Sequence, residues 1–510
     1  MSVANAAPLT THPQLYPAVA GIQTDGRRPQ GLVLLAVGRV SIVLAAIASV
    51  RAMTTLLSPA EVGHYSVVTT FAMWFSLTLV SPSGNYINRR LMDWVYAGVI
   101  WRELRKYLLL LLLTAVFTAA ISYIGQQTTW LDTGETAMVL ILCVVGILVI
   151  LTVNTMVIGF LNLLGRRNSY VLYTSATAWI GLVMSVVLTL RFGYGVELWI
   201  AGQVLGWALV AVPAFVCLRR TVAISQVVLR TTPAEQNGLW AFVWPLIIST
   251  SLYWFQVQGY RIELEHWVSF SAVGLLMTGL VLGANPVTII DTLLGEYLRP
   301  QYLQAISGND RAMQEAAWSD MATTFLSILI PVAVFVGFSG PFITALLVGS
   351  AFQSVSGLVA WGVLLEFSRA VNSMYVAAAH TRYKTRVTLT PAIVGSAIVL
   401  ISIVPLARWN LYNGTGLALV IGMSASTAYL ALNLKPVFTT RISLPKLVQS
   451  LRRSGPVAIG LVAVQFVLRH PSQVQAVIVL TVFCIATLGL QMRGNQFLLP
   501  LITKTGAKQA

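Results

Sequence analysis

Apolar runs of about 20 residues recur along the chain, and this pattern limits the possible folds more than any other. A run of that length crosses the roughly 30 Å hydrocarbon core of a bilayer as an α-helix. Only 9% of the 510 residues are charged, against about 25% in soluble domains. The sequence therefore predicts an all-α polytopic membrane protein with about 14 transmembrane helices, at 31–53, 64–86, 107–125, 137–160, 171–191, 198–218, 239–258, 268–290, 320–338, 351–378, 387–406, 415–434, 454–469 and 475–492.

The basic residues indicate how these helices are oriented. If both ends of the chain are cytoplasmic, the cytoplasmic connections contain 25 of the 32 Lys and Arg residues and the opposite connections contain five. This is the bias that orients helices in membranes. The net charge of +16 thus lies in short connections rather than in a patch that could neutralise phosphates, so we expect no nucleic-acid partner.

The sequence contains an internal repeat. A shift of 211 residues aligns Ser58 with Ser269 and Gly63 with Gly274, so that both copies have the pattern S-x-x-x-V-G before an apolar span. Six helices separate the copies, an even number, so the repeat is predicted to be parallel. The predicted organisation is a cytoplasmic tail, a six-helix lobe, a cytoplasmic linker, a second six-helix lobe, a basic connection with two extra helices and a cytoplasmic tail, at 1–30, 31–218, 219–238, 239–434, 435–492 and 493–510.

Ionisable side chains inside spans are the candidate site residues, because a charge at the middle of a span costs at least about 2.5–3.5 kcal/mol. Arg39 lies in the first predicted helix, and Glu366 and Arg369 lie three residues apart on one face of the tenth. The alternatives are that Arg39 caps backbone carbonyls and that Glu366 and Arg369 only neutralise each other. The candidate cavity residues are Arg39, Glu366, Arg369, Asn372, Gln256 and Asn154.

A second group of polar residues lies near the ends of the predicted spans. Snorkelling is easy there, so structural roles compete with a role at the rim or in a gate. The candidate rim or gate residues are Arg51, Arg261, Glu263, Glu265 and Asp291, the last at the cytoplasmic end of the eighth helix.

The segment RAMTTLLSPAEVGHYSVVTTFAMWFSLTLV, with its L-L-S-P-x-E-x-G-x-Y turn, resembles bacterial polysaccharide flippases. These belong to the multidrug/oligosaccharidyl-lipid/polysaccharide exporter superfamily. The resemblance implies two six-helix lobes and a location in the bacterial inner membrane. It also implies export of an undecaprenyl-diphosphate-linked oligosaccharide to the periplasmic leaflet for exopolysaccharide, O-antigen or capsule assembly. The implied partners are this lipid-linked substrate, membrane lipids and a polysaccharide polymerase machinery.

Two other functions remain as alternatives. A drug/cation antiporter of the same superfamily would share the fold, but Arg39 and Arg369 against Glu366 leave one positive charge in excess, which favours a diphosphate. A polysaccharide polymerase would need a long periplasmic segment, which the predicted connections lack. We find no nucleotide-binding or metalloprotease motif, so we expect a transporter without a cofactor, coupled to H⁺ or Na⁺.

Overall fold

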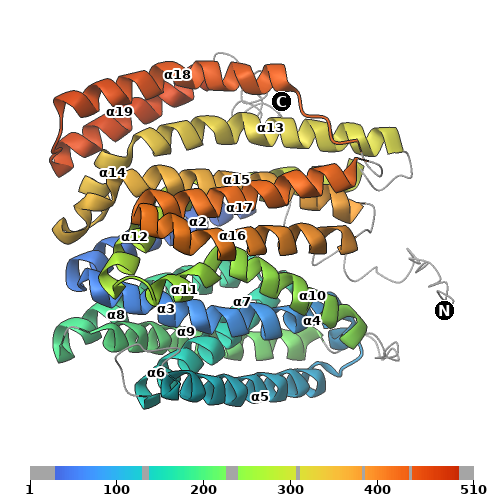
Figure 1. Ribbon diagram of the computed structural model, residues 1–510. Coiled ribbons are helices and arrows are strands. Elements are labelled where there is room, and N and C mark those ends of the chain that lie inside the picture. Colours follow the sequence, from blue (N-terminus) through green and yellow to red (C-terminus); the bar gives the residue numbers. More distant parts are fainter. Residues whose placement is uncertain are drawn as a thin grey trace.

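The computed structural model describes residues 29–128, 137–193, 195–225, 239–305, 311–381, 385–435 and 439–492. Within these ranges every regular element is a helix, and the helices lie side by side in one bundle (Figure 1). The all-α prediction is therefore confirmed. Residues 1–28 and 493–510 of the predicted tails, and residues 226–238 of the predicted linker, lie outside the described residues.

The first half of the chain forms what we call the N-terminal lobe. Its helices are α2 (Pro29–Leu56), α3 (Pro59–Phe75), α4 (Ser81–Tyr96), α5 (Ile100–Gln127), α6 (Ala137–Gly146), α7 (Thr152–Leu163), α8 (Arg167–Phe192) and α9 (Val196–Ser225). The π-helical turn η3 (Ser76–Val80) joins α3 to α4, and η4 (Ile147–Leu151) joins α6 to α7.

The second half forms the C-terminal lobe, α10 to α17, and a final helix pair. Its α-helices are α10 (Leu239–Trp254), α11 (Tyr260–Glu265), α12 (Phe270–Ala305), α13 (Arg311–Phe338), α14 (Gly340–Leu347), α15 (Ser356–Thr381), α16 (Leu389–Trp409), α17 (Leu411–Leu434), α18 (Leu444–Val467) and α19 (Gln473–Met492). The shorter elements are the π turn η5 (Phe255–Gly259) and the 3-10 turns η6 (Ser350–Val355) and η7 (Thr385–Thr388).

Twelve helical segments in the described part are long and apolar enough to cross a membrane, each on a predicted span. The other two predicted spans, 239–258 and 454–469, are also helical, as α10 to η5 and as α18, but are not among the twelve. Large apolar side chains face outward, such as Leu113 on α5 and Ile485 on α19, which are 68% and 64% exposed. Such a surface fits contact with lipid rather than with water.

The helix boundaries differ from the prediction at the end of α12, which lies 15 residues after the predicted end of its span, and at the start of α18. The latter helix begins at Leu444, ten residues before the predicted start, with Pro445 in its first turn. Proline fits that position because its missing N–H would have no intrahelical partner there. The early turns carry Lys446, Arg452 and Arg453, so they are polar and fell outside a prediction based on apolar length alone.

The two copies of the repeated motif begin their helices in the same way. The Ser58 hydroxyl accepts a hydrogen bond from the backbone N–H of Glu61 at 3.4 Å, and the Glu61 carboxylate accepts one from the backbone N–H of Ser58 at 2.7 Å. These two bonds form a capping box, so local helix chemistry accounts for Ser58 and Glu61. In the second copy, the Ser269 hydroxyl accepts from the N–H of Ala272 at 3.3 Å.

The first turns of α3 and α12 contact each other reciprocally. A methyl group at Gly63 would overlap the carbonyl oxygen of Phe270, and one at Gly274 would overlap that of Pro59. Pro59 and Phe270 are themselves 211 residues apart. Reciprocal contact of this kind is what a two-fold axis between like elements produces. Because both first turns meet, both helices enter from the same end of the bundle, as a parallel repeat requires.

The lobes also repeat their internal packing. In the N-terminal lobe α8 packs along α9 and against α2; in the C-terminal lobe α16 packs along α17 and against α10 and α11. Small residues allow the close approach in both pairs, with Gly206 against Gly181 and Gly422 against Gly395. The helix pair α18–α19 packs outside this arrangement on α13 and α14, at one edge of the bundle (Figure 1).

Candidate functional site

Two helices of the C-terminal lobe, α12 and α15, approach each other closely and carry the charged residues of the candidate site. A methyl group at Gly283 would overlap the carbonyl oxygen of Val359, and one at Gly362 would overlap that of Leu280. The absence of side chains at these glycines lets the two backbones touch. The next turns of both helices therefore place their polar side chains within bonding reach of each other.

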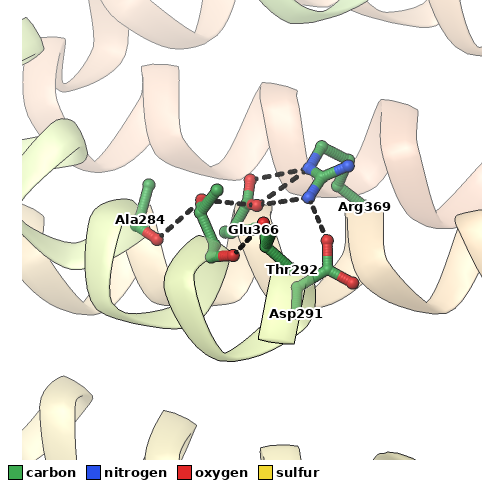
Figure 2. A network of polar contacts seen from close by, with 6 residues as sticks. Ala284, Asp291, Thr292, Glu366 and Arg369 are labelled. Atoms are coloured by element: carbon green, nitrogen blue, oxygen red, sulfur yellow. Dashed lines mark hydrogen bonds and ion pairs between the residues drawn. The ribbon is translucent and has the colours of Figure 1, made fainter. Parts of the chain in front are cut away.

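An ionic network joins α12 to α15 (Figure 2). The Arg369 guanidinium donates to both oxygens of Glu366, with Nε 2.9 Å from each, and its Nη2 lies 2.6 Å from Asp291 Oδ2. The hydroxyl of Thr288 donates to Glu366 Oε1 at 2.7 Å. The two carboxylates are each 10% exposed and Arg369 is 25% exposed. All four side chains are thus held in one partly enclosed group, which we call the Arg369 network.

The Arg369 network lies within two candidate membrane spans. Glu366 and Arg369 are 16 and 19 residues into the 30-residue segment Ser350–Ala379, and Asp291 is four residues before the end of Phe270–Gly295. Asp291 therefore does not stand alone at a rim, because it pairs with a residue from the middle of another span. Ionised, the three charged groups sum to −1.

This sum changes the balance expected from the sequence. Arg39 and Arg369 against Glu366 alone leave an excess of one positive charge, but Asp291 cancels it. The charge count therefore no longer favours an anionic substrate over a cationic one. Two carboxylates around one guanidinium form instead a group that can accept one proton or one monovalent cation without becoming positive.

Three further polar residues of the C-terminal lobe are Tyr253, Gln256 and Asn372. Tyr253 of α10 lies close enough for its hydroxyl to interact with the Arg369 guanidinium, and it is partly exposed. Asn372, one turn beyond Arg369, donates to Ser426 Oγ of α17 at 3.4 Å. Gln256 of η5 is buried and contacts the sulfur of Met423, as Asn372 also does. Gln256 and Asn372 thus contact the same methionine in the interior of the C-terminal lobe.

The other two predicted cavity residues belong to the N-terminal lobe. Asn154 of α7 is fully buried and donates to Thr177 Oγ1 of α8 at 3.0 Å, which ties two helices together. Arg39 is half-buried on α2, next to Gly38, whose Cα packs against Val171 of α8. One residue in a helix turns by about 100°, so Arg39 lies to the side of this contact with α8.

Two of the predicted gate residues connect the lobes. Arg51 of α2 donates to the carbonyl oxygen of Val348, at the end of α14, and Arg261 of α11 donates to Thr70 Oγ1 of α3 at 2.9 Å. Glu263 is exposed and accepts a local bond from Trp267 at 3.4 Å, and Glu265 is half-buried at the end of α11. Arg51 and Arg261 thus lie at contacts that must break if the lobes separate there.

Sequence reasoning missed Thr288 and Tyr253. Thr288 and Asp291 are three residues apart on α12, the spacing of Glu366 and Arg369 on α15. A pair of polar residues at that spacing, on the helix predicted to repeat the second span, was an available signal for Thr288. No signal was available for Tyr253, because tyrosine is common toward the ends of spans.

No protein-family model and no curated protein match the chain. Solved structures do. One described as the lipid II flippase MurJ in an inward closed conformation has a TM-score of 0.64 and 12% identity, covering 92% of this chain and 100% of its own. Another, an inward-facing multidrug resistance MATE family transporter of the MOP superfamily, has a TM-score of 0.56 and 16% identity, covering 79% of this chain and 98% of its own. The chain therefore has the fold of these transporters.

Proposed function

We propose that the protein is a flippase that moves an undecaprenyl-diphosphate-linked oligosaccharide from the cytoplasmic to the periplasmic leaflet by alternating access. The observation that carries this proposal is the fold it shares with a lipid II flippase over nearly the whole of both chains. The proposed site is a space between the lobes that Arg39 and the Arg369 network would line in the transporting protein. The proposed setting is the bacterial inner membrane, with both termini cytoplasmic and a polysaccharide polymerase acting on the exported product.

The extent of the structural match favours a lipid flippase over a drug exporter. Residues 1–434 make up about 85% of the chain, so a match over 92% must include part of the final helix pair. The match to the multidrug transporter, at 79%, does not require α18 and α19. Part of a helix pair beyond the two lobes is thus a feature that this chain has in common with the flippase.

The Arg369 network supplies the proposed means of coupling. In the described arrangement Arg369 neutralises one of its two carboxylates, and the other is in excess. A proton or Na⁺ at Asp291 or Glu366 would remove this excess and weaken the hold on Arg369. The guanidinium could then turn toward a diphosphate, which it can bind through two parallel hydrogen bonds. On leaving, the cation would restore the present pairing and favour release of the substrate.

Export of an organic cation is the second candidate function. The net charge of −1 on the Arg369 network favours it, since a positively charged drug could take the place proposed for Na⁺ or a proton. The two functions differ in what Arg39 does. A diphosphate needs a second cation opposite the network, whereas a cationic drug would be repelled by one.

A reconstituted system separates the two functions. The purified protein would be reconstituted in liposomes that contain a fluorescent undecaprenyl-diphosphate oligosaccharide. The fraction of this labelled lipid that an impermeant quencher can reach would be measured over time. We expect this fraction to change with the wild-type protein, to stay constant with Arg39→Ala, and to change slowly with Arg39→Lys. Efflux of ethidium without movement of any lipid-linked oligosaccharide would contradict the flippase and support the cation exporter.

The orientation can be tested independently. A reporter that is active only in the periplasm, fused after Ala510, should be inactive in cells. An active reporter would place the C-terminus outside and invert the proposed direction.

A further inference from the structure

We propose that a hollow on the outer face of the N-terminal lobe binds one anionic phospholipid, in the leaflet that is cytoplasmic in the proposed orientation. The hollow lies between the first turns of α8 and the last turns of α9 and has a volume of about 640 Å³. This is within the range of ligand sites, roughly 300–1,000 Å³. Its lining is Arg166, Ser169, Tyr173, Val212, Pro213, Val216, Cys217, Arg220 and Thr221. The proposal does not depend on the transported substrate.

One end of the hollow is strongly basic. Arg166 and Arg220 line it, and each has a second arginine next to it, Arg167 and Arg219. No carboxylate of the described residues pairs with any of the four. The one acidic residue on α8 or α9 is Glu197, at the opposite end of α9, 23 residues from Arg220 or about 35 Å. Four arginines that no described carboxylate pairs with attract an anion, and guanidinium groups match phosphate oxygens.

The other end of the hollow is apolar. Val212, Pro213 and Val216 lie on an exposed face of α9, where the surface is otherwise apolar. Two contacts join α8 to α9 at the bottom of the hollow. The Tyr173 hydroxyl donates to the carbonyl oxygen of Pro213 at 3.4 Å, and the Cys217 thiol lies 3.7 Å from Ser169 Oγ. A ligand here would meet cations at one end and hydrocarbon at the other.

The depth of the hollow selects a phospholipid as the occupant. Arg220 is 24 residues after the start of α9, about 36 Å along the helix, so it lies near one boundary of a bilayer about 30 Å thick in its core. Val212 lies two turns deeper. A headgroup phosphate at the arginines would therefore place an acyl chain along Val216 and Val212. A soluble phosphate would leave this apolar part unfilled.

Native mass spectrometry of the full-length protein in detergent tests the proposal. Phosphatidylglycerol or phosphatidylcholine would be added and the bound lipids counted. We expect one tightly bound phosphatidylglycerol, and binding about 25-fold weaker in Arg166→Ala/Arg220→Ala, from a factor of about five for each arginine. Arg452→Ala/Arg453→Ala removes the same charge from α18 and should bind as the wild type does. Equal binding by the two double variants would overturn the proposal.

Two further measurements use the hollow itself. Val216→Trp would fill its apolar part and should also weaken phosphatidylglycerol, while leaving all arginines in place. In a Cys143→Ser/Cys484→Ser background, phosphatidylglycerol should slow alkylation of Cys217 severalfold and phosphatidylcholine should not. Alkylation that neither lipid slows would overturn the proposal. Protection of Cys217 by inorganic phosphate alone would overturn it in favour of a soluble anion.

Discussion

The two lobes repeat one fold but differ in the charge of one helix pair. In the C-terminal lobe α12 and α15 carry Asp291, Glu366 and Arg369. In the N-terminal lobe α3 with η3 packs against α6 with η4 in the corresponding place, and the segment 137–163 contains no charged residue. Val80 lies 211 residues before Asp291 and is buried, 3% exposed. The same helix pair therefore forms with and without ions.

This difference teaches that the fold does not require the Arg369 network. Charges inside a span are costly, and a buried ion pair is often no more stable than apolar residues of the same volume. An ionic group in one copy and uncharged residues in the other are thus better explained by function than by stability. The following variants test that difference, from the largest expected effect to the smallest.

Breaking the Arg369 network from one side should have the largest effect. Arg369→Ala leaves two carboxylates facing each other in a partly enclosed site, so we expect a loss of about 3–5 kcal/mol in the free energy of unfolding. Denaturant unfolding in detergent would measure it. Arg452→Ala, on the exposed surface of α18, is the control and should change little. A stability of Arg369→Ala equal to the control would mean that the network is weakly paired.

Removing the support of Glu366 should have a smaller effect. Thr288→Val keeps the shape of the side chain and removes its hydroxyl, the donor to Glu366 Oε1. A hydrogen bond to a charged group contributes about 1.5–3 kcal/mol, and we expect a loss in this range. Thr155→Val in the N-terminal lobe removes a hydroxyl that bonds only carbonyl oxygens of its own helix, and it should cost less. Equal losses of stability in Thr288→Val and Thr155→Val would mean that the bond to Glu366 adds no stability in the C-terminal lobe.

The reciprocal contact between α3 and α12 tests the repeat itself. Gly63→Ala and Gly274→Ala each place a methyl group against a backbone carbonyl of the other helix, and each should cost about 1–3 kcal/mol. Gly159→Ala on α7, where a methyl group meets nothing within 4 Å, is the control and should be neutral or stabilising. Melting temperatures of the three variants give the comparison. Unequal losses of stability in Gly63→Ala and Gly274→Ala would show that the two halves of the contact do not contribute equally.

The two helix starts should show the smallest effect. Ser58→Ala removes the hydroxyl of a full capping box and should cost about 1 kcal/mol. Ser269→Ala removes a single bond of 3.3 Å and should cost no more than that. Thermal unfolding of both variants measures the difference. A larger loss at Ser269 would mean that the second motif carries stability beyond its cap.

Much of the fold could be predicted because the bilayer fixes the length of an apolar helix, and the repeat could be predicted because Ser58 and Gly63 recur as Ser269 and Gly274. The spacing of Glu366 and Arg369 was enough to predict their pairing. The pairing of Asp291 could not be predicted because its partner lies 78 residues away, and sequence distance does not show which helices touch. The roles of Gln256 and Asn154 could not be predicted, because a polar side chain in a span can either line a cavity or form a hydrogen bond to another helix. The sequence does not distinguish these two roles.

The most direct test neutralises the whole Arg369 network at once. Arg369→Met/Glu366→Gln/Asp291→Asn gives the C-terminal lobe an uncharged helix pair like that of the N-terminal lobe. Unfolding and movement of a lipid-linked oligosaccharide would be measured on the same preparation in liposomes. We predict that the triple variant inserts and unfolds close to the wild-type temperature but moves no substrate. Wild-type transport by a stable triple variant, or loss of folding in it, would contradict the functional assignment of the network.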